Sequence, residues 1–149
     1  MKNLYMLLFA LTLLLSGHIY AQTSWTGERN ANWNVAGNWT QGVPDETIDA
    51  IVGDENFTGT RQPTIRQNTS LKSLHIGEGA QPVEITIRRN ITLTEDLVIG
   101  ANGTVIQENN SSILLEGNWV NAGTYTGEGA RSQVIFSGAS QELTGRRAF

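Results

Sequence analysis

The segment TSLKSLHIG at residues 69–77 returns as ITLTEDLVIG at residues 91–100 and as ILLEGNWVNA at residues 113–122. Apolar and polar residues alternate within each copy, and Gly, Asn or Ser residues follow it. Alternation inside a longer fixed period is typical of short β-strands that bury one face by stacking coil on coil. The sequence therefore predicts an all-β fold, a right-handed parallel β-helix or solenoid with coils of about 22 residues.

The register of these copies predicts which side chains point into the core. Residues two positions apart lie on the same face of a strand, so each coil should add one apolar residue to a column. A fourth copy begins one residue early, at Val134. The predicted column consists of Leu71, Leu93, Leu115 and Phe136.

Asparagines before the strands are a second repeated feature. Asn68 and Asn90 each precede a copy of the pattern, and Ser112 takes this position in the third copy. Asn side chains stacked at equal positions form hydrogen-bonded ladders in β structures. We therefore expect a structural ladder at this corner of the coil.

The N-terminus has the features of a secretory signal peptide. Lys2 precedes an apolar run from Leu4 to Leu15, and Ala21 supplies a small residue for cleavage. A membrane span needs about 20 residues, which is longer than this run, so a retained anchor is the less favoured alternative. Residues 1–21 are predicted to be removed, which makes the mature chain a secreted or cell-surface protein.

The composition argues against several classes of protein. Ten basic residues face fourteen acidic ones, a net charge of −4, whereas nucleic-acid binding needs a basic patch. The chain contains no cysteine, which excludes disulfides and thiolate chemistry. We expect no nucleic-acid partner and no membrane-embedded segment after removal of the signal peptide.

Three of the four tryptophans, Trp25, Trp33 and Trp39, lie close together among Gly and Asn residues. Such a cluster either seals the end of a core or stacks on sugar rings. The first coil of a solenoid needs a cap, because it otherwise exposes core and unpaired strand edges. We interpret residues 22–62 as a Trp-rich cap and residues 63–149 as about four coils, incomplete at the C-terminus.

Acidic residues are frequent after the tryptophans, around a strand predicted at residues 48–52. Calcium takes six to eight oxygen ligands, but the spacing of these residues matches no calcium loop. Carboxylates at exposed turns are usually solvated, and this is the interpretation we prefer to a calcium site. The residues concerned are Asp45, Glu46, Asp49, Asp54 and Glu55.

Paired carboxylates on neighbouring coils would indicate a catalytic site. A glycosidase needs two carboxylates about 5 to 9.5 Å apart, which neighbouring coils could offer at equal positions. A 22-residue register instead aligns Glu95 with Ser73, and Arg88 with Arg66 rather than with an acid. His75 is expected on the outer surface. The sequence therefore predicts no catalytic, cofactor-binding or metal site.

An ice-binding surface would need a flat ladder of threonines. In the same register Thr92 lies between Ser70 and Leu114, and Thr94 is flanked by charged residues. The sequence therefore predicts no threonine ladder.

The chain resembles the start of large secreted repeat proteins of Bacteroidetes-type bacteria. The resemblance is carried by WTGERNANWNVAGNWTQGVP at residues 25–44, QPTI at residues 62–65 and NAGTYTG at residues 121–127. It implies export, association with the cell surface or matrix, and a structural or adhesive role. Such proteins continue through many more coils to a C-terminal sorting domain, and this chain departs from them in length.

These patterns together predict an exported structural or adhesive β-solenoid without catalysis. Its partner would be a polysaccharide or protein of the cell surface or matrix, and its open last coil should fray or self-associate from Ser132 onward. One alternative is a carbohydrate-binding module that uses the three N-terminal tryptophans. Another is part of a β-helix enzyme that degrades polysaccharides.

Overall fold

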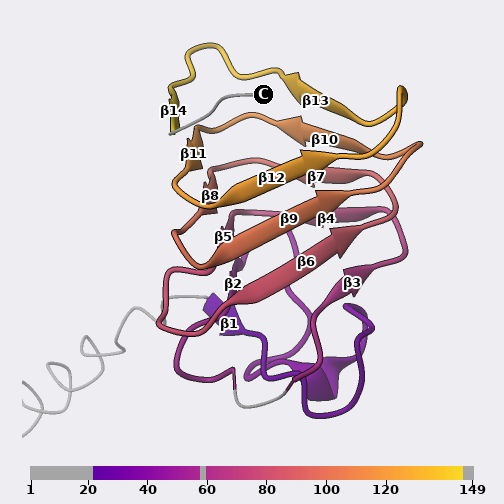
Figure 1. The fold of residues 1–149 in the computed structure, drawn as a ribbon, viewed down its shortest axis with the longest axis vertical. Coiled ribbons are helices and arrows are strands. Elements are labelled where there is room, and N and C mark those ends of the chain that lie inside the picture. The colour runs from indigo at the N-terminus through magenta and orange to yellow at the C-terminus, as the bar shows by residue number, and fades with distance from the viewer. Residues whose placement is uncertain (1–21, 58–59, 146–149) are drawn as a thin grey trace, which may run out of the picture.

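The computed structural model describes residues 22–57 and 60–145, so the predicted signal peptide lies outside the described residues. The chain winds as a parallel β-solenoid of about four turns with coils of about 22 residues (Figure 1). Near strands run left to right and far strands right to left as the chain rises, which makes the winding right-handed. The predicted fold class is confirmed.

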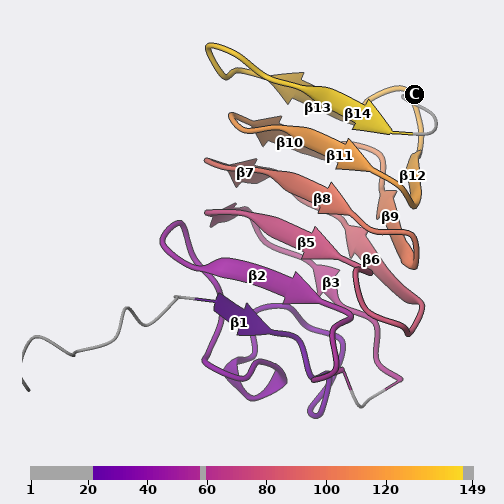
Figure 2. The same cartoon turned by 90° about the vertical axis from the view of Figure 1, so that its left-hand side faces the viewer.

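Three parallel sheets form the walls of the solenoid (Figures 1 and 2). Sheet A contains β1 (Gln22–Ser24), β2 (Asp49–Val52), β5 (Leu74–Ile76), β8 (Leu97–Ile99), β11 (Trp119–Asn121) and β14 (Leu143–Gly145). Sheet B contains β4 (Thr69–Leu71), β7 (Ile91–Leu93), β10 (Ser112–Leu115) and β13 (Gln133–Phe136). Sheet C contains β3 (Thr64–Ile65), β6 (Val83–Ile87), β9 (Gly103–Gln107) and β12 (Thr124–Gly127).

The interior is filled by apolar columns from all three walls. In sheet B, Leu71 pairs with Leu93, Leu93 with Leu115, and Leu115 with Phe136. The three leucines are fully buried and Phe136 is partly buried against them. The predicted column and the one-residue slip of the fourth copy are both confirmed. Stacking of identical or similar side chains keeps the coil shape constant, which is why the repeat can propagate.

The number of residues between paired positions of neighbouring coils varies more in sheet C than the 22-residue register implies. Thr64 pairs with Thr86, 22 positions on, but Thr104 pairs with Thr124, only 20 positions on. The turn that leads from sheet A into sheet C shortens from residues 77–82 to residues 100–102 and then to residues 122–123. Each shortening shifts the register of sheet C relative to sheet A.

Glycine makes the tight version of this turn feasible. Gly77 has φ +69°, in the left-handed region, and a Cβ there would lie 2.0 Å from the backbone nitrogen of Gly103. Only a residue without a side chain fits this approach of two backbones. The close stacking of neighbouring turns therefore depends on glycine at this position.

The predicted asparagine ladder exists, with a different bonding pattern from stacked side-chain amides. The Asn68 Oδ1 accepts from the Asn90 backbone N–H at 3.3 Å, and the Asn90 Oδ1 accepts from the Ser112 N–H at 3.0 Å. Each side chain therefore bonds the backbone of the next coil. A second ladder of this type joins Asp96, Asn118 and Glu142, with side-chain oxygens 2.7 and 2.9 Å from the next N–H.

The Trp-rich segment is joined to the coils through sheet A. β1 pairs with β2, and β2 pairs with β5, all in parallel. Between β1 and β2 the chain makes turns and one 3₁₀ helix, η1 (Ala36–Asn38), rather than an extended segment. In the described residues no helix has the length and hydropathy that crossing a membrane requires.

Candidate functional site

The three N-terminal tryptophans form one buried cluster beneath the first coil. Trp25 and Trp33 are fully buried and Trp39 is 5% exposed. The Trp33 and Trp39 rings meet edge to face with centroids 4.5 Å apart, and Trp25 packs edge to face on Trp39 at 5.2 Å. Stacking on a sugar needs an exposed ring face, whereas these rings cover one another and the core. The cluster has the geometry of a cap.

Two of the three indole N–H groups are tied to the backbone of the cap. Trp25 Nε1 donates to the Arg61 carbonyl at 2.9 Å, and Trp39 Nε1 donates to the Trp33 carbonyl at 2.8 Å. Trp33 Nε1 is buried and has no hydrogen-bond partner within the described part of the chain. Trp33 therefore contributes chiefly by packing, while the other two also fix the path of the chain.

Asn38 organises the loop around this cluster, a role that the sequence did not reveal. Its side chain is fully buried, and its Oδ1 accepts from the backbone N–H groups of Arg29 and Asn30 at 2.8 and 3.0 Å. Its Nδ2 donates to the Asn30 Oδ1 and to the Asn32 carbonyl. One amide at the end of η1 thus satisfies four groups of the irregular segment at residues 29–32, which is a common use of buried Asn.

The five acidic residues considered for calcium do not converge on one point. The Thr47 hydroxyl donates to Asp45 at 2.7 Å, and this hydrogen bond holds the pKa of Asp45 below its usual value. Asp54 accepts from the Ser24 hydroxyl at 2.6 Å and from the Asn56 side chain at 2.9 Å. No group of three or more metal-ligating side chains occurs within residues 22–57 and 60–145.

Charged side chains at the corner between sheets B and A form a short ladder instead. Lys72 Nζ lies 3.0 Å from an Asp49 carboxylate oxygen and 3.8 Å from one of Glu95. The hydrogen bond to Asp49 raises the pKa of Lys72. The Glu95 N–H donates to the Lys72 carbonyl, which continues the 22-residue register of Leu93 on Leu71 and agrees with the predicted alignment of Glu95 with Ser73. The spacing becomes 23 residues only at β8, where Leu97 pairs with Leu74.

The prediction that Arg88 has no acid in register is wrong. Arg88 Nε lies 2.8 Å from an oxygen of Glu108. The two residues follow Ile87 and Gln107, which pair across β6 and β9. Glu108 follows Arg88 by 20 positions in the sequence, so a fixed 22-residue register does not pair the two residues. His75 does face outward as predicted, and its Nδ1 lies 2.8 Å from Glu78 Oε2.

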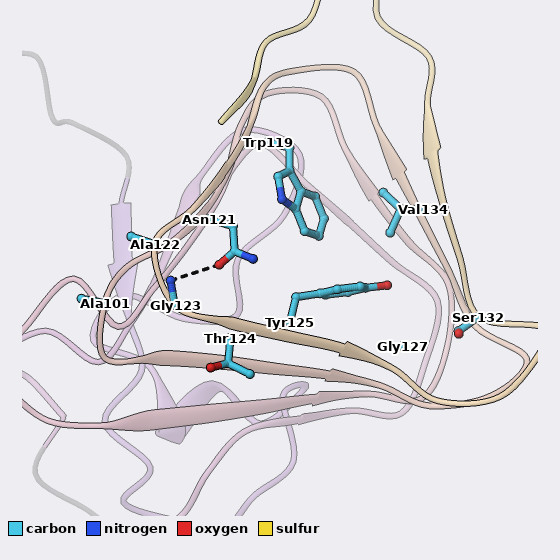
Figure 3. Close-up of a pocket in the computed structure, with 10 residues that line it drawn as sticks. All are labelled: Ala101, Trp119, Asn121, Ala122, Gly123, Thr124, Tyr125, Gly127, Ser132 and Val134. Carbon is cyan, nitrogen blue, oxygen red and sulfur yellow. Dashed lines mark hydrogen bonds between the residues drawn. The ribbon is translucent and has the colours of Figure 1, made fainter. Parts of the chain in front are cut away.

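A cavity of about 1050 Å³ opens inside the last described coil (Figure 3). Trp119 and Tyr125 face each other in it, edge to face, with ring centroids 5.0 Å apart. The Tyr125 hydroxyl donates to the Gln107 Oε1 at 2.5 Å, and burial raises the pKa of Tyr125. Gln107 is itself fully buried and donates to the carbonyls of Ser111 and Gln133. The cavity continues the core, and all the side chains that line it are neutral.

The prediction that Thr92 belongs to no threonine ladder is confirmed, because Thr92 lies between Ser70 and Leu114 in sheet B. On the outer face of sheet C, however, Thr104 pairs with Thr124, and neighbouring positions also carry threonine. The 20-residue spacing of these strands hid the alignment.

Comparisons with known proteins identify the family of this chain but assign no activity to it. Neither the curated proteins nor the solved structures yield a match to this chain. Residues 24–135 match the model of a domain of unknown function, DUF8693. That match begins in the buried Trp cluster and continues into β13, so it includes both the cap and the coils. The chain therefore belongs to the DUF8693 family, a β-solenoid with an N-terminal Trp cluster.

Proposed function

We propose that this β-solenoid is an exported structural or adhesive segment of a secreted or cell-surface protein. The observation that carries this proposal is the stacking of equivalent residues in register along three walls. Such walls present side chains at regular intervals along an extended surface, which suits contact with an extended partner better than capture of a small molecule. The partner class that we propose is a polysaccharide or protein of the cell surface or matrix.

Export rests on the predicted signal peptide and on the resemblance to large secreted repeat proteins. Intact mass of the protein recovered from the periplasm or medium should correspond to a chain that begins at Gln22. Deletion of residues 2–21 is the control and should leave the protein in the cytoplasm. Recovery of a surface or medium form that retains residues 1–21 would contradict cleavage and favour an anchor.

A tryptophan variant tested in two binding assays distinguishes adhesion from carbohydrate binding. Affinity electrophoresis through gels that contain common polysaccharides tests retention, and binding of labelled protein to intact cells tests adhesion. If the Trp cluster only caps the core, Trp33→Phe should alter neither readout. Retention on a polysaccharide that Trp33→Phe abolishes, in a variant that is still folded, would instead favour the carbohydrate-binding module.

The last described coil supports a proposal about self-association. Leu143 pairs in register with the buried Trp119, yet it is 45% exposed. β12, β13 and β14 are also the terminal strands of their sheets. Apolar positions and strand edges of this kind favour pairing with another chain. Light scattering over a concentration series should show association that Leu143→Asp weakens, and a concentration-independent monomer would contradict it.

A further inference from the structure

The outer face of sheet C carries a small regular array of threonines. β6 and β9 each span five residues and therefore place two residues outward between three inward ones. One outward row consists of Glu84, Thr104 and Thr124, and the adjacent row of Thr86, Ile106 and Thr126. Four of these six positions are threonine and a fifth is another β-branched residue.

The array is exposed and chemically available. Thr124 and Thr126 are exposed, and Thr86 and Thr104 are half-buried by their neighbours in the sheet. None of the four hydroxyls makes a hydrogen bond to any described residue. β-branched side chains have few accessible χ1 rotamers, so a partner has to fix little side-chain freedom when it binds this face.

The spacing of the array is set by the backbone. Neighbouring strands lie about 4.8 Å apart, and outward residues on one strand lie about 6.6 Å apart. β-sheets normally twist, but β6, β9 and β12 run in nearly the same direction, as Figure 1 shows. The outward residues therefore repeat in two directions, along each strand and from strand to strand.

We propose that this threonine face binds ice. Water oxygens on the prism faces of hexagonal ice repeat at distances similar to these in two perpendicular directions. Hydroxyl groups can replace water at lattice points, while the methyl groups beside them favour ordered water in the spaces between. Ice fits better than a polysaccharide because no aromatic ring lies in the array to stack on sugars.

The other two walls do not offer such an array. The central outward row of sheet B runs Ser70, Thr92, Leu114 and Ile135, and becomes apolar along the solenoid. The central outward row of sheet A contains Ile51, His75, Val98, Val120 and Thr144. The proposal therefore concerns sheet C alone and goes beyond the scaffold role proposed above.

A pair of matched substitutions tests the proposal. Thr104→Lys places a long cation in the centre of the array, and Thr92→Lys makes the same change on sheet B. Both threonines are half-buried and face outward from central strands, so the two variants should have similar melting temperatures. If Thr104→Lys fails to fold, Thr124→Lys at the more exposed neighbouring position replaces it.

The readouts are the shape of single ice crystals and the rate of ice recrystallisation in dilute protein. We expect faceted crystals and slowed recrystallisation with the unmodified protein and with Thr92→Lys, and at least a tenfold higher concentration requirement for Thr104→Lys. Unaltered ice growth with the unmodified protein, or equal losses in both variants, would overturn the proposal. Retention on crystalline cellulose without an effect on ice would assign the face to a polysaccharide instead.

Discussion

Asn38 in the Trp-rich cap and Asn90 in the coils both begin an Asn-x-Thr triplet, yet the two regions use them differently. The Asn38 side chain is buried and makes four hydrogen bonds within one irregular loop. The Asn90 side chain is exposed and accepts one hydrogen bond from the next coil. The cap is thus held by particular side chains, whereas each coil is held by its repetition on its neighbours.

The largest effect should come from removing a ring at the centre of the cap. Trp33→Ala empties a fully buried site, and we expect a loss of about 3–5 kcal/mol in the free energy of unfolding. Chemical denaturation followed by tryptophan fluorescence or circular dichroism measures it. Unchanged stability would mean that the cluster does not cap the core and would remove the basis of the comparison.

A core substitution in the middle of the coils should be nearly as costly. Leu93→Ala truncates a fully buried side chain that lies between Leu71 and Leu115, and we expect a loss of about 2–5 kcal/mol. Thr92→Ala, the outward neighbour, should cost less than about 0.5 kcal/mol. Comparable losses from the two would contradict the register of sheet B.

The asparagine pair sharpens the contrast between regions. Asn38→Ala leaves buried partners without hydrogen bonds and should cost about 1–3 kcal/mol. Asn90→Ala frees one backbone N–H at an exposed corner where water can replace the amide, so it should cost less than about 0.5 kcal/mol. Both values come from the same denaturation experiment. A larger loss at Asn90 would show that the ladders, rather than the cap loop, depend on individual side chains.

The smallest effect separates packing from hydrogen bonding inside the cap. Trp33→Phe and Trp39→Phe remove similar ring volume, but only Trp39→Phe also breaks an indole hydrogen bond, to the Trp33 carbonyl. Trp39→Phe should therefore be about 1 kcal/mol more destabilising. Equal stability of the two variants would indicate that the 2.8 Å bond contributes little to the cap.

The sequence alone determined the solenoid, because the evidence for it is local and repeated. Alternation within each copy assigned Leu71, Leu93 and Leu115 to the core, and the early start at Val134 correctly shifted the fourth copy. The clustering of tryptophans before the repeats likewise indicated a cap. These patterns follow from strand geometry and from the need to cover the end of a core.

Only the tertiary structure decided how residues at the corners and on the outer faces align. Turns of different length lead into sheet C, so Arg88 meets Glu108 and Thr104 meets Thr124 at separations that no single period predicts. The hydrogen bonds of Asn38 were equally hidden, since an irregular loop has no period. Apolar columns tolerate no slip because they must stay buried, whereas turn length is free to vary wherever the backbone can still close.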